Sequence, residues 1–267
     1  MIDSSTFRSS NDNVQLSIFL TAGYPDFVTC GALLDTLATH PAVSFVELGM
    51  PFSDPLADGP TIQRASEVAL AQGTTVDDVM ALAARFRAAC QKPLMLMGYC
   101  NPIYRRGIKT FTAEARSAGV TGLILPDLPY ESHHQDFEAH LKSTGLSMAF
   151  LVSPTSTQTS VSQAFNSSSA FVYGVANVGL TGDAQSMDRG AFFSGLQEHR
   201  RQCPLVAGFG LSSPADVASL TGLADGAIIG SAFIRAIAPE QDGPASPESA
   251  VQRALNFLNP FPPNPEI

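Results

Sequence analysis

The sequence has little charge and few clusters of positive residues. Charged residues make up 15% of the 267 positions, and 24 acidic residues outnumber 15 basic ones, giving a formal net charge of -9. No basic cluster is longer than a pair such as Arg105 and Arg106. The stripe of positive charge that nucleic acid requires is therefore missing. An anionic small molecule would have to be bound by local donors.

Signals for metal sites, disulfides, secretion and membrane insertion are also missing. The four cysteines are scattered without a C-x-x-C pair, which argues against a zinc site or a disulfide framework and favours a reducing compartment. The polar start lacks the apolar segment of a signal peptide. No apolar stretch approaches the ~18 residues that would span a bilayer. We therefore expect a cytoplasmic protein that binds neither membranes nor nucleic acid.

What the sequence does contain is a regular alternation of short apolar runs with longer segments typical of helices. The eight runs predict strands at residues 16–20, 43–48, 93–98, 120–125, 146–152, 169–176, 204–208 and 225–230. The segments between and after them predict helices at residues 26–39, 61–71, 76–90, 108–118, 131–143, 157–166, 189–201 and 214–221. Strands that are apolar on both faces and alternate with helices indicate a parallel sheet with right-handed crossovers.

The number of these units decides between two α/β architectures. Eight units in about 230 residues favour a closed (β/α)8 TIM barrel over an open doubly wound sheet. No G-x-G-x-x-G motif follows the first strand, which further weakens a dinucleotide-binding fold. We expect one domain over residues 1–267, with a loop at 239–249 and a last short helix at 250–258. A proline-rich C-terminal tail without regular structure follows from about residue 259.

The stretch "VELGMPFSDPLADGP" at residues 46–60 concentrates acids in a chain that has few of them. Glu47 alternates with Phe45 along the second strand and would face the barrel interior, where desolvation raises the pKa of a carboxyl group. Such a group could donate and accept a proton near neutral pH. The alternative is a carboxylate paired within the core. Asp54 and Asp58 follow in the loop, where either one alone also fits a solvated acid.

Two glycine motifs follow the last two predicted strands. They are "GFGLSSP" at residues 208–214 and "GSA" at residues 230–232. Backbone N–H groups at these places can converge on one phosphate, and the loops after strands seven and eight are the usual phosphate site of a barrel. "GLTG" at residues 179–182 could supply further donors and a mobile lid. The sequence therefore predicts a phosphate-binding barrel.

Together these motifs resemble the tryptophan synthase alpha subunit family. The likeness includes the acidic stretch, "TAGYP" (21–25), "YCNPIYRRG" (99–107), "LPDLP" (125–129) and the glycine motifs, and covers roughly residues 16–237. The family has a (β/α)8 barrel and cleaves indole-3-glycerol phosphate to indole and glyceraldehyde 3-phosphate in a retro-aldol reaction. The resemblance thus implies a lyase of tryptophan biosynthesis that uses general acid-base catalysis.

The resemblance also implies roles for individual residues. Glu47 would be the general acid-base, Asp58 would hydrogen-bond the indole N–H and stabilise its positive charge, and Asp54 would belong to a loop that contacts the partner. The indole pocket would include Phe19, Ile124, Leu151, Tyr173 and Phe209, and the phosphate donors would be Gly182, Gly210, Gly230 and Ser231. Tyr99 and Thr181 complete the implied substrate-binding set.

The family uses no metal or cofactor of its own. The resemblance implies a pyridoxal-phosphate-dependent beta subunit as partner, in an alpha2beta2 heterotetramer. One departure affects the lid: the family usually has Ser-Arg where this chain has Ala176 and Asn177. Asparagine lacks the charge and the forked donors of arginine. This departure supports an alternative function, a catalytically weak regulatory subunit that binds the phosphate ligand and activates the beta subunit.

Overall fold

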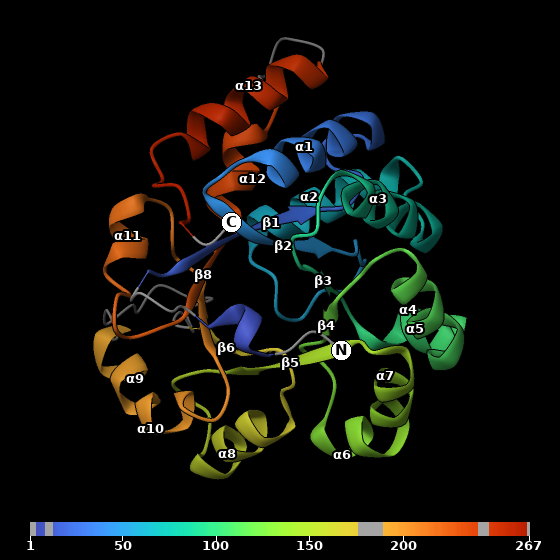
Figure 1. Ribbon diagram of the computed structural model, residues 1–267. Coiled ribbons are helices and arrows are strands. Elements are labelled where there is room, and N and C mark those ends of the chain that lie inside the picture. Colours follow the sequence, from blue (N-terminus) through green and yellow to red (C-terminus); the bar gives the residue numbers. More distant parts are fainter. Residues whose placement is uncertain (1–3, 9–12, 176–188, 240–245, 266–267) are drawn as a thin grey trace.

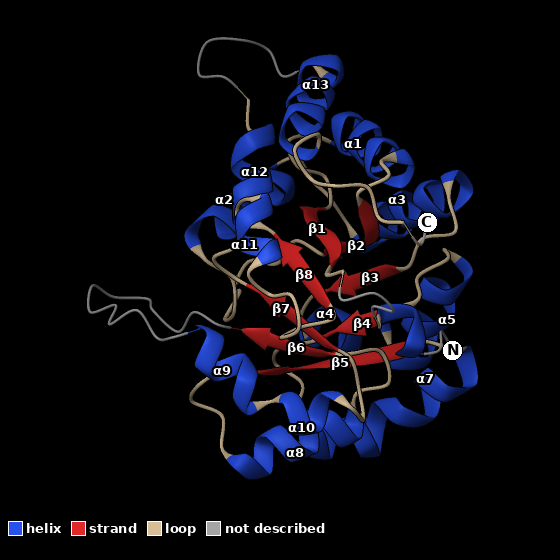
Figure 2. Ribbon diagram, turned by 60° about the vertical axis from the view of Figure 1, so that its left-hand side comes forward, coloured by secondary structure: helices blue, strands red, loops and turns tan. Residues whose placement is uncertain are grey.

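The computed structural model describes residues 4–8, 13–175, 189–239 and 246–265. Eight parallel strands close into a barrel in chain order, each pairing with the next and β8 pairing with β1. A ring of helices surrounds the barrel (Figure 1), and the view in Figure 2 shows the strands in red enclosed by helices in blue. The predicted (β/α)8 TIM barrel is confirmed.

All eight predicted strands are present, with ends that differ by a few residues. They are β1 (Gln15–Thr21), β2 (Val43–Gly49), β3 (Leu94–Met97), β4 (Gly122–Ile124), β5 (Ser147–Val152), β6 (Val172–Val175), β7 (Leu205–Gly208) and β8 (Gly226–Ile229). Almost every strand residue is buried. This follows from parallel strands whose outer face is covered by helices and whose inner face fills the barrel.

The described helices cover the outside of the barrel and the ends of the chain. They are η1 (Ser4–Phe7), α1 (Phe27–Thr39), α2 (Pro60–Ala71), α3 (Val76–Ala89), α4 (Cys100–Arg106), α5 (Ile108–Ser117), α6 (Tyr130–Ser132), η2 (His133–Phe137), α7 (Glu138–Thr144), α8 (Gln158–Ser167), α9 (Arg189–Gly195), α10 (Gln197–Arg200), α11 (Pro214–Ala218), α12 (Ser231–Ile237) and α13 (Pro247–Leu258). The single helices predicted at 131–143 and 189–201 are wrong, because each segment is divided into shorter elements. The helix predicted at 214–221 ends early, at Ala218.

Three short helices were not predicted, η1, α4 and α12, and α13 begins within the segment predicted as loop. Helix α4 is capped from a distant loop, because the backbone N–H of Cys100 donates to both carboxylate oxygens of Asp127 at 3.1 and 3.0 Å. A cap that another part of the chain supplies leaves no local sequence signal. Pro247 lies in the first turn of α13, where proline is favoured, and Ser246 is its N-cap.

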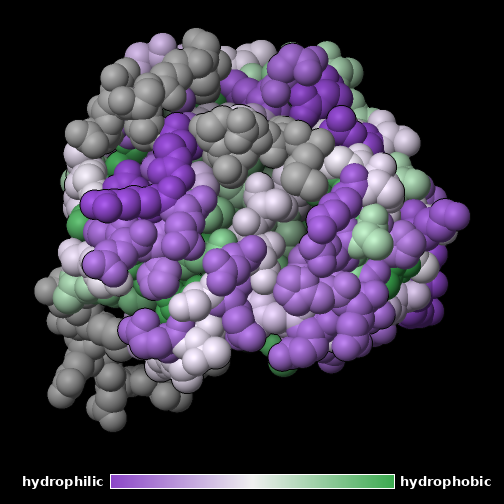
Figure 3. Space-filling model, turned by 60° about the horizontal axis from the view of Figure 1, so that its bottom comes forward, coloured by the Kyte–Doolittle hydropathy of each residue, from purple (hydrophilic) through white to green (hydrophobic). Residues whose placement is uncertain are grey.

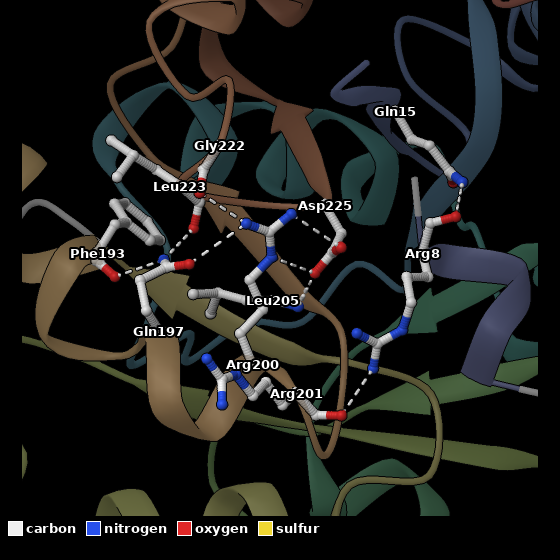
Figure 4. Close-up of polar contacts among 10 residues, drawn as sticks. All are labelled: Arg8, Gln15, Phe193, Gln197, Arg200, Arg201, Leu205, Gly222, Leu223 and Asp225. Atoms are coloured by element: carbon white, nitrogen blue, oxygen red, sulfur yellow. Dashed lines mark hydrogen bonds and ion pairs between the residues drawn. The ribbon is translucent and has the colours of Figure 1, made fainter. Parts of the chain in front are cut away.

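The end of the barrel at which the strands begin is sealed by aromatic rings and one ion pair. The ring of Phe7 packs edge-on against Phe45 at 5.3 Å and against Phe171 at 5.0 Å between centroids. Beside β8, Asp225 accepts hydrogen bonds from the Arg200 guanidinium at 3.0 and 3.1 Å and from the Leu205 N–H at 2.8 Å (Figure 4). These contacts pack this end of the barrel and give the buried Asp225 carboxylate a cation.

The tail after α13 has no helix or strand in its described part, as predicted, yet it is fixed to the barrel. Phe261 is buried, and Asn264 donates its backbone N–H to the Pro41 carbonyl at 2.9 Å and its side-chain amide to Ser44 Oγ at 2.8 Å. On the face shown in Figure 3, hydrophilic residues predominate and hydrophobic ones show mainly in recesses.

Candidate active site

A cavity of about 790 Å³ opens at the end of the barrel where the strands finish. Its described lining comes from strand ends and the loops after them. The lining residues are Phe19, Glu47, Leu56, Ala57, Asp58, Gly59, Pro60, Ile62, Met97, Ile124, Pro126, Leu151, Ser153, Tyr173, Val175, Phe209, Gly210, Leu211, Ser212, Ile228, Gly230, Ser231, Ala232 and Arg235. Active sites of this fold lie at this end of the barrel. The cavity has the size of a small-molecule site.

Glu47 lies on the floor of this cavity. The strand register places it between Phe19 of β1 and Met95 of β3, and only 2% of its surface is exposed. Burial, reinforced by the nearby charge of Asp58, raises the pKa of Glu47 to about 8, against a hydrogen bond from Tyr173 that lowers it. Its Oε2 atom is buried and has no partner among the described residues. Glu47 therefore lines the cavity with one carboxyl oxygen that no described protein group binds.

Asp58 lies in the loop between β2 and α2 and faces the same cavity. Burial raises its pKa to about 6, while a hydrogen bond from the Tyr99 hydroxyl opposes the rise. The hydroxyl donates to Asp58 Oδ2 at 3.1 Å. The backbone carbonyl of Asp58 accepts from Gln63 Nε2 at 2.8 Å, which ties the loop to the first turns of α2. Both acids of the predicted catalytic pair thus lie together.

Tyr99 does not line the cavity; it lies behind Asp58 and is almost fully buried. Its hydroxyl accepts a hydrogen bond from the Ala57 N–H at 3.1 Å while it donates to Asp58. Its ring stacks on Phe52 at 5.1 Å with an interplanar angle of 26°. The sequence predicted substrate contact for Tyr99, whereas its position is that of a support that holds the acidic loop.

The apolar walls of the cavity include every residue predicted for the indole pocket. Phe19, Ile124, Leu151, Tyr173 and Phe209 all line it. Two of these rings lie directly against glycines. A Cβ at Gly49 would be 2.5 Å from Phe19, and one at Gly208 would be 2.1 Å from Tyr173. Glycine at these two positions is what allows the rings to lie so close to the neighbouring strands.

The predicted phosphate donors Gly210, Gly230 and Ser231 also line the cavity. Phe209 and Gly210 both have positive φ, 69° and 72°, directly after β7 ends. The carbonyl of Gly210 accepts from Arg189 Nη2 at 3.3 Å. Gly230 and Ser231 form the start of α12. Ser212 is less suited, since its N–H already donates to Asp216.

The remaining residues of the lid prediction, Ala176, Asn177, Thr181 and Gly182, lie outside the described residues. Asp54 is exposed and lies outside the main cavity, in the same loop as Asp58. Among the described residues, no group of three or more His, Cys, Asp or Glu side chains could hold a metal ion. None of the helices in the described ranges is both long and apolar enough to cross a membrane.

Sequence reasoning missed several lining residues, of which Arg235 is the most informative. It lies four residues after Ser231 on the unpredicted helix α12, and residues four apart share a helix face. Recognising α12 as a helix would have placed Arg235 near the phosphate glycines. Ile62 and Pro60 were missed because they belong to the start of α2 and not to a strand end.

Comparison with known proteins identifies the family. The family model described as "Tryptophan synthase alpha chain" matches residues 7–260. The chain belongs to this family. The tryptophan synthase alpha chain of Geotalea daltonii is 42% identical over 229 residues, 85% of this chain and 86% of that one. The alpha chain of Burkholderia pseudomallei is 40% identical over 243 residues, covering 90% and 87%.

Solved structures of tryptophan synthases resemble the fold of this chain. A Mycobacterium tuberculosis tryptophan synthase structure matches with a TM-score of 0.83 and 30% identity, covering 96% of this chain and 95% of that one. A Pyrococcus furiosus tryptophan synthase complex matches with a TM-score of 0.80 and 30% identity, covering 92% and 97%. The chain is therefore a lyase of tryptophan biosynthesis, and its reaction is the cleavage of indole-3-glycerol phosphate.

Proposed function

We propose that Glu47 and Asp58 divide the chemistry of this cleavage between them. The observation that carries the proposal is their unequal acidity within one cavity, with a pKa of about 8 for Glu47 and about 6 for Asp58. At pH 7 Glu47 is then mainly protonated and Asp58 mainly ionised. Two titratable groups whose surroundings separate their pKa values can serve as acid and counter-charge at the same pH.

The reaction needs a proton at carbon 3 of the indole ring before the carbon-carbon bond can break. Glu47 donates this proton, and the ring becomes an indolenine with positive charge at nitrogen. Asp58 accepts a hydrogen bond from the indole N–H and stabilises that charge. Glu47, now a carboxylate, removes the proton of the adjacent glycerol hydroxyl as the carbon-carbon bond breaks. The electron pair of that bond returns to the ring and neutralises the charge at nitrogen. Indole and glyceraldehyde 3-phosphate leave, and Glu47 is protonated again.

The cavity walls supply the binding contacts in this proposal. The apolar side formed by Phe19, Ile124, Leu151, Tyr173 and Phe209 accommodates the indole ring. The backbone N–H groups at Gly210, Gly230 and Ser231 bind the phosphate. Thr181 and Gly182 belong to the proposed set on their sequence motif alone.

Tyr99 serves as a positioning residue in this scheme. Its hydroxyl, held by Ala57 and Asp58 at 3.1 Å each, fixes the direction of the Asp58 carboxylate. A hydrogen bond to the charged form of an acid favours ionisation. Tyr99 therefore keeps Asp58 charged as well as oriented.

We further propose that the chain acts with a tryptophan synthase beta subunit in an alpha2beta2 complex, as the Pyrococcus furiosus enzyme does. Leu56 of the acidic loop, which lines the cavity, and Tyr104 of α4 are exposed, 81% and 45%, and offer apolar surface to a partner. The pyridoxal phosphate of the complex belongs to the beta subunit, and the alpha chain needs no cofactor for its own step. Asp54 would contribute to this interface.

Two further proposals concern the cellular location of the protein and its domain organisation. The cytoplasm is the proposed location, supported by Cys30, Cys90, Cys100 and Cys203, which are all free thiols and fit a reducing compartment. A single domain over residues 1–267 is proposed because α13 packs against α1 and α12 and the described core forms one cluster.

The test is indole release from indole-3-glycerol phosphate by the purified chain, with and without a beta subunit. We expect Glu47→Gln and Asp58→Asn each to lower turnover by about 10²–10⁴-fold, while binding of glycerol 3-phosphate stays within about twofold of wild type. The wild-type rate should rise with pH as Asp58 ionises near 6 and fall as Glu47 ionises near 8. Turnover retained by Glu47→Gln would remove Glu47 from the mechanism.

A further inference from the structure

The charges around the cavity are unevenly distributed. Its described lining carries two acids, Glu47 and Asp58, and a single basic side chain, Arg235. The substrate carries a phosphate, and it must enter this acidic cavity in a chain of net charge -9. A cation at the phosphate side would favour the correct direction of entry, because charge lining a cleft raises the local concentration of an oppositely charged ligand.

Arg235 is placed to provide that cation. It lies one helical turn after Ser231 on α12, so both residues face the same side of the helix. Its Nη1 donates to Thr61 Oγ1 of α2 at 3.3 Å, which uses one of the five guanidinium donors. Arg235 thus spans the cavity rim between α12 and α2, with donors left for a ligand.

Arg235 lines the cavity and has no acid to neutralise it. Arg85, Arg106 and Arg200 each form an ion pair with an aspartate. Among the described residues, no carboxylate lies within salt-bridge distance of Arg235. Guanidinium and phosphate match in geometry as well as charge. An unpaired arginine beside phosphate-binding glycines is suited to that ligand.

We propose that Arg235 is a specificity-determining residue that selects the phosphorylated substrate. The inference rests on the proposed phosphate site at Gly210, Gly230 and Ser231. The guanidinium pairs with the phosphate group of indole-3-glycerol phosphate on entry and of glyceraldehyde 3-phosphate on release. It touches neither the indole ring nor the bond that breaks. Its effect therefore falls on the binding of phosphorylated ligands and leaves the chemical step unchanged.

The reverse reaction separates this role from a structural one, because indole lacks a phosphate and glyceraldehyde 3-phosphate has one. We expect Arg235→Gln to raise the KM for glyceraldehyde 3-phosphate and for indole-3-glycerol phosphate about tenfold, equivalent to about 1.4 kcal/mol. The KM for indole and the kcat should stay within about twofold. Arg235→Lys keeps the positive charge, so its KM values should stay much closer to wild type than those of Arg235→Gln. Added salt should reduce the difference in KM between wild type and Arg235→Gln.

Two control variants make the test strict. Thr61→Val removes the hydrogen bond to Arg235 and keeps the charge, and Arg64→Gln removes one positive charge from α2 outside the cavity lining. Both should leave the KM values near wild type. The proposal is overturned if Thr61→Val reproduces the effect of Arg235→Gln, if the KM for indole rises equally, or if Arg235→Gln changes nothing.

A binding measurement keeps this inference separate from the proposed mechanism. Glycerol 3-phosphate, a probe without the indole ring, is titrated into wild type, Arg235→Gln and Glu47→Gln in a calorimeter. We expect about tenfold weaker binding to Arg235→Gln and unchanged binding to Glu47→Gln. Equal binding of glycerol 3-phosphate to all three proteins would refute the role of Arg235, even if the role of Glu47 is confirmed. Loss of turnover in Arg235→Gln without weaker binding of glycerol 3-phosphate would not support the proposal.

Discussion

Asp225, where β8 begins, and Glu47, near the end of β2, are both almost fully buried carboxylates, 1% and 2% exposed. Asp225 is paired with Arg200 and also accepts the Leu205 N–H (Figure 4). Glu47 has no cation beside it and one oxygen without a partner among the described residues. The same functional group is therefore paired with a cation at one end of the barrel and left without one at the other. Pairing, and not burial, separates the two roles.

The largest expected effect comes from breaking the ion pair between Arg200 and Asp225. Arg200→Met leaves Asp225 buried without its cation, and we expect the free energy of unfolding to fall by about 3–5 kcal/mol, as for other buried pairs that lose one partner. Urea unfolding measures the change. Arg201→Met, at the exposed neighbouring residue, is the matched control and should stay within about 0.5 kcal/mol of wild type.

Turnover of the folded fraction sharpens the same comparison. Arg200→Met should keep a normal kcat per folded molecule, because the ion pair lies at the far end of the strands from the cavity. A variant that remains folded and loses turnover would show that the two ends are coupled.

A second, smaller effect on stability is expected at the other end of the barrel, where the Glu47 carboxyl group has no cation beside it. The raised pKa of Glu47 means that the unfolded chain ionises this group near its usual 4.5 while the folded chain holds the proton to about 8. Stability therefore falls as pH rises through this window, since the folded state binds the extra proton. Glu47→Gln removes the penalty, and we expect it to stabilise the chain by about 1–3 kcal/mol at pH 8–9.

At pH 4 the same substitution should leave stability nearly unchanged, because Glu47 is protonated in both states. Chemical denaturation at both pH values measures the difference, and Glu67→Gln, at an exposed acid of α2, controls for loss of one negative charge. Destabilisation by Glu47→Gln at pH 8–9 would mean that Glu47 is paired as Asp225 is, and the contrast between the two ends would fail.

The third effect concerns Tyr99, which gives Asp58 part of the support that Arg200 gives Asp225. Tyr99→Phe removes one hydrogen bond to Asp58, worth about 0.5–1.5 kcal/mol. We expect the acidic limb of the kcat profile to move from near 6 to higher pH by up to about one unit, with the alkaline limb unmoved. Tyr130→Phe, which loses a hydroxyl bonded to the Ser160 carbonyl, should leave both limbs in place. An unchanged acidic limb in Tyr99→Phe would exclude this role.

The smallest effect is expected at the tail. Asn264→Ala removes the side-chain hydrogen bond to Ser44 and keeps the backbone bond to Pro41. We expect a loss of about 0.5–1 kcal/mol in the free energy of unfolding and an unchanged kcat. Thermal unfolding measures the loss. A change in kcat would show that the start of β2 is coupled to Glu47 at its other end.

The sequence predicts the barrel well because each strand is marked by its own apolar run and each turn by glycine or proline. It predicts Glu47 and Asp58 because their motif is specific. It cannot predict Tyr99 as a support, since the contact joins residues 41 positions apart. Nor can it find the cap that Asp127 supplies to α4. These two contacts depend on how separate loops meet in space. Arg235 is different, because it is missed only when α12 is not recognised as a helix.

The hydrogen bond between Asn264 and Ser44 joins residues 220 positions apart, and Ser44 is the second residue of β2, the strand that carries Glu47. During synthesis, this strand emerges early from the ribosome and receives its final anchor only when almost the whole chain has been made. The strand that carries Glu47 is therefore synthesised early and anchored late. A chain interrupted before residue 264 would lack this anchor.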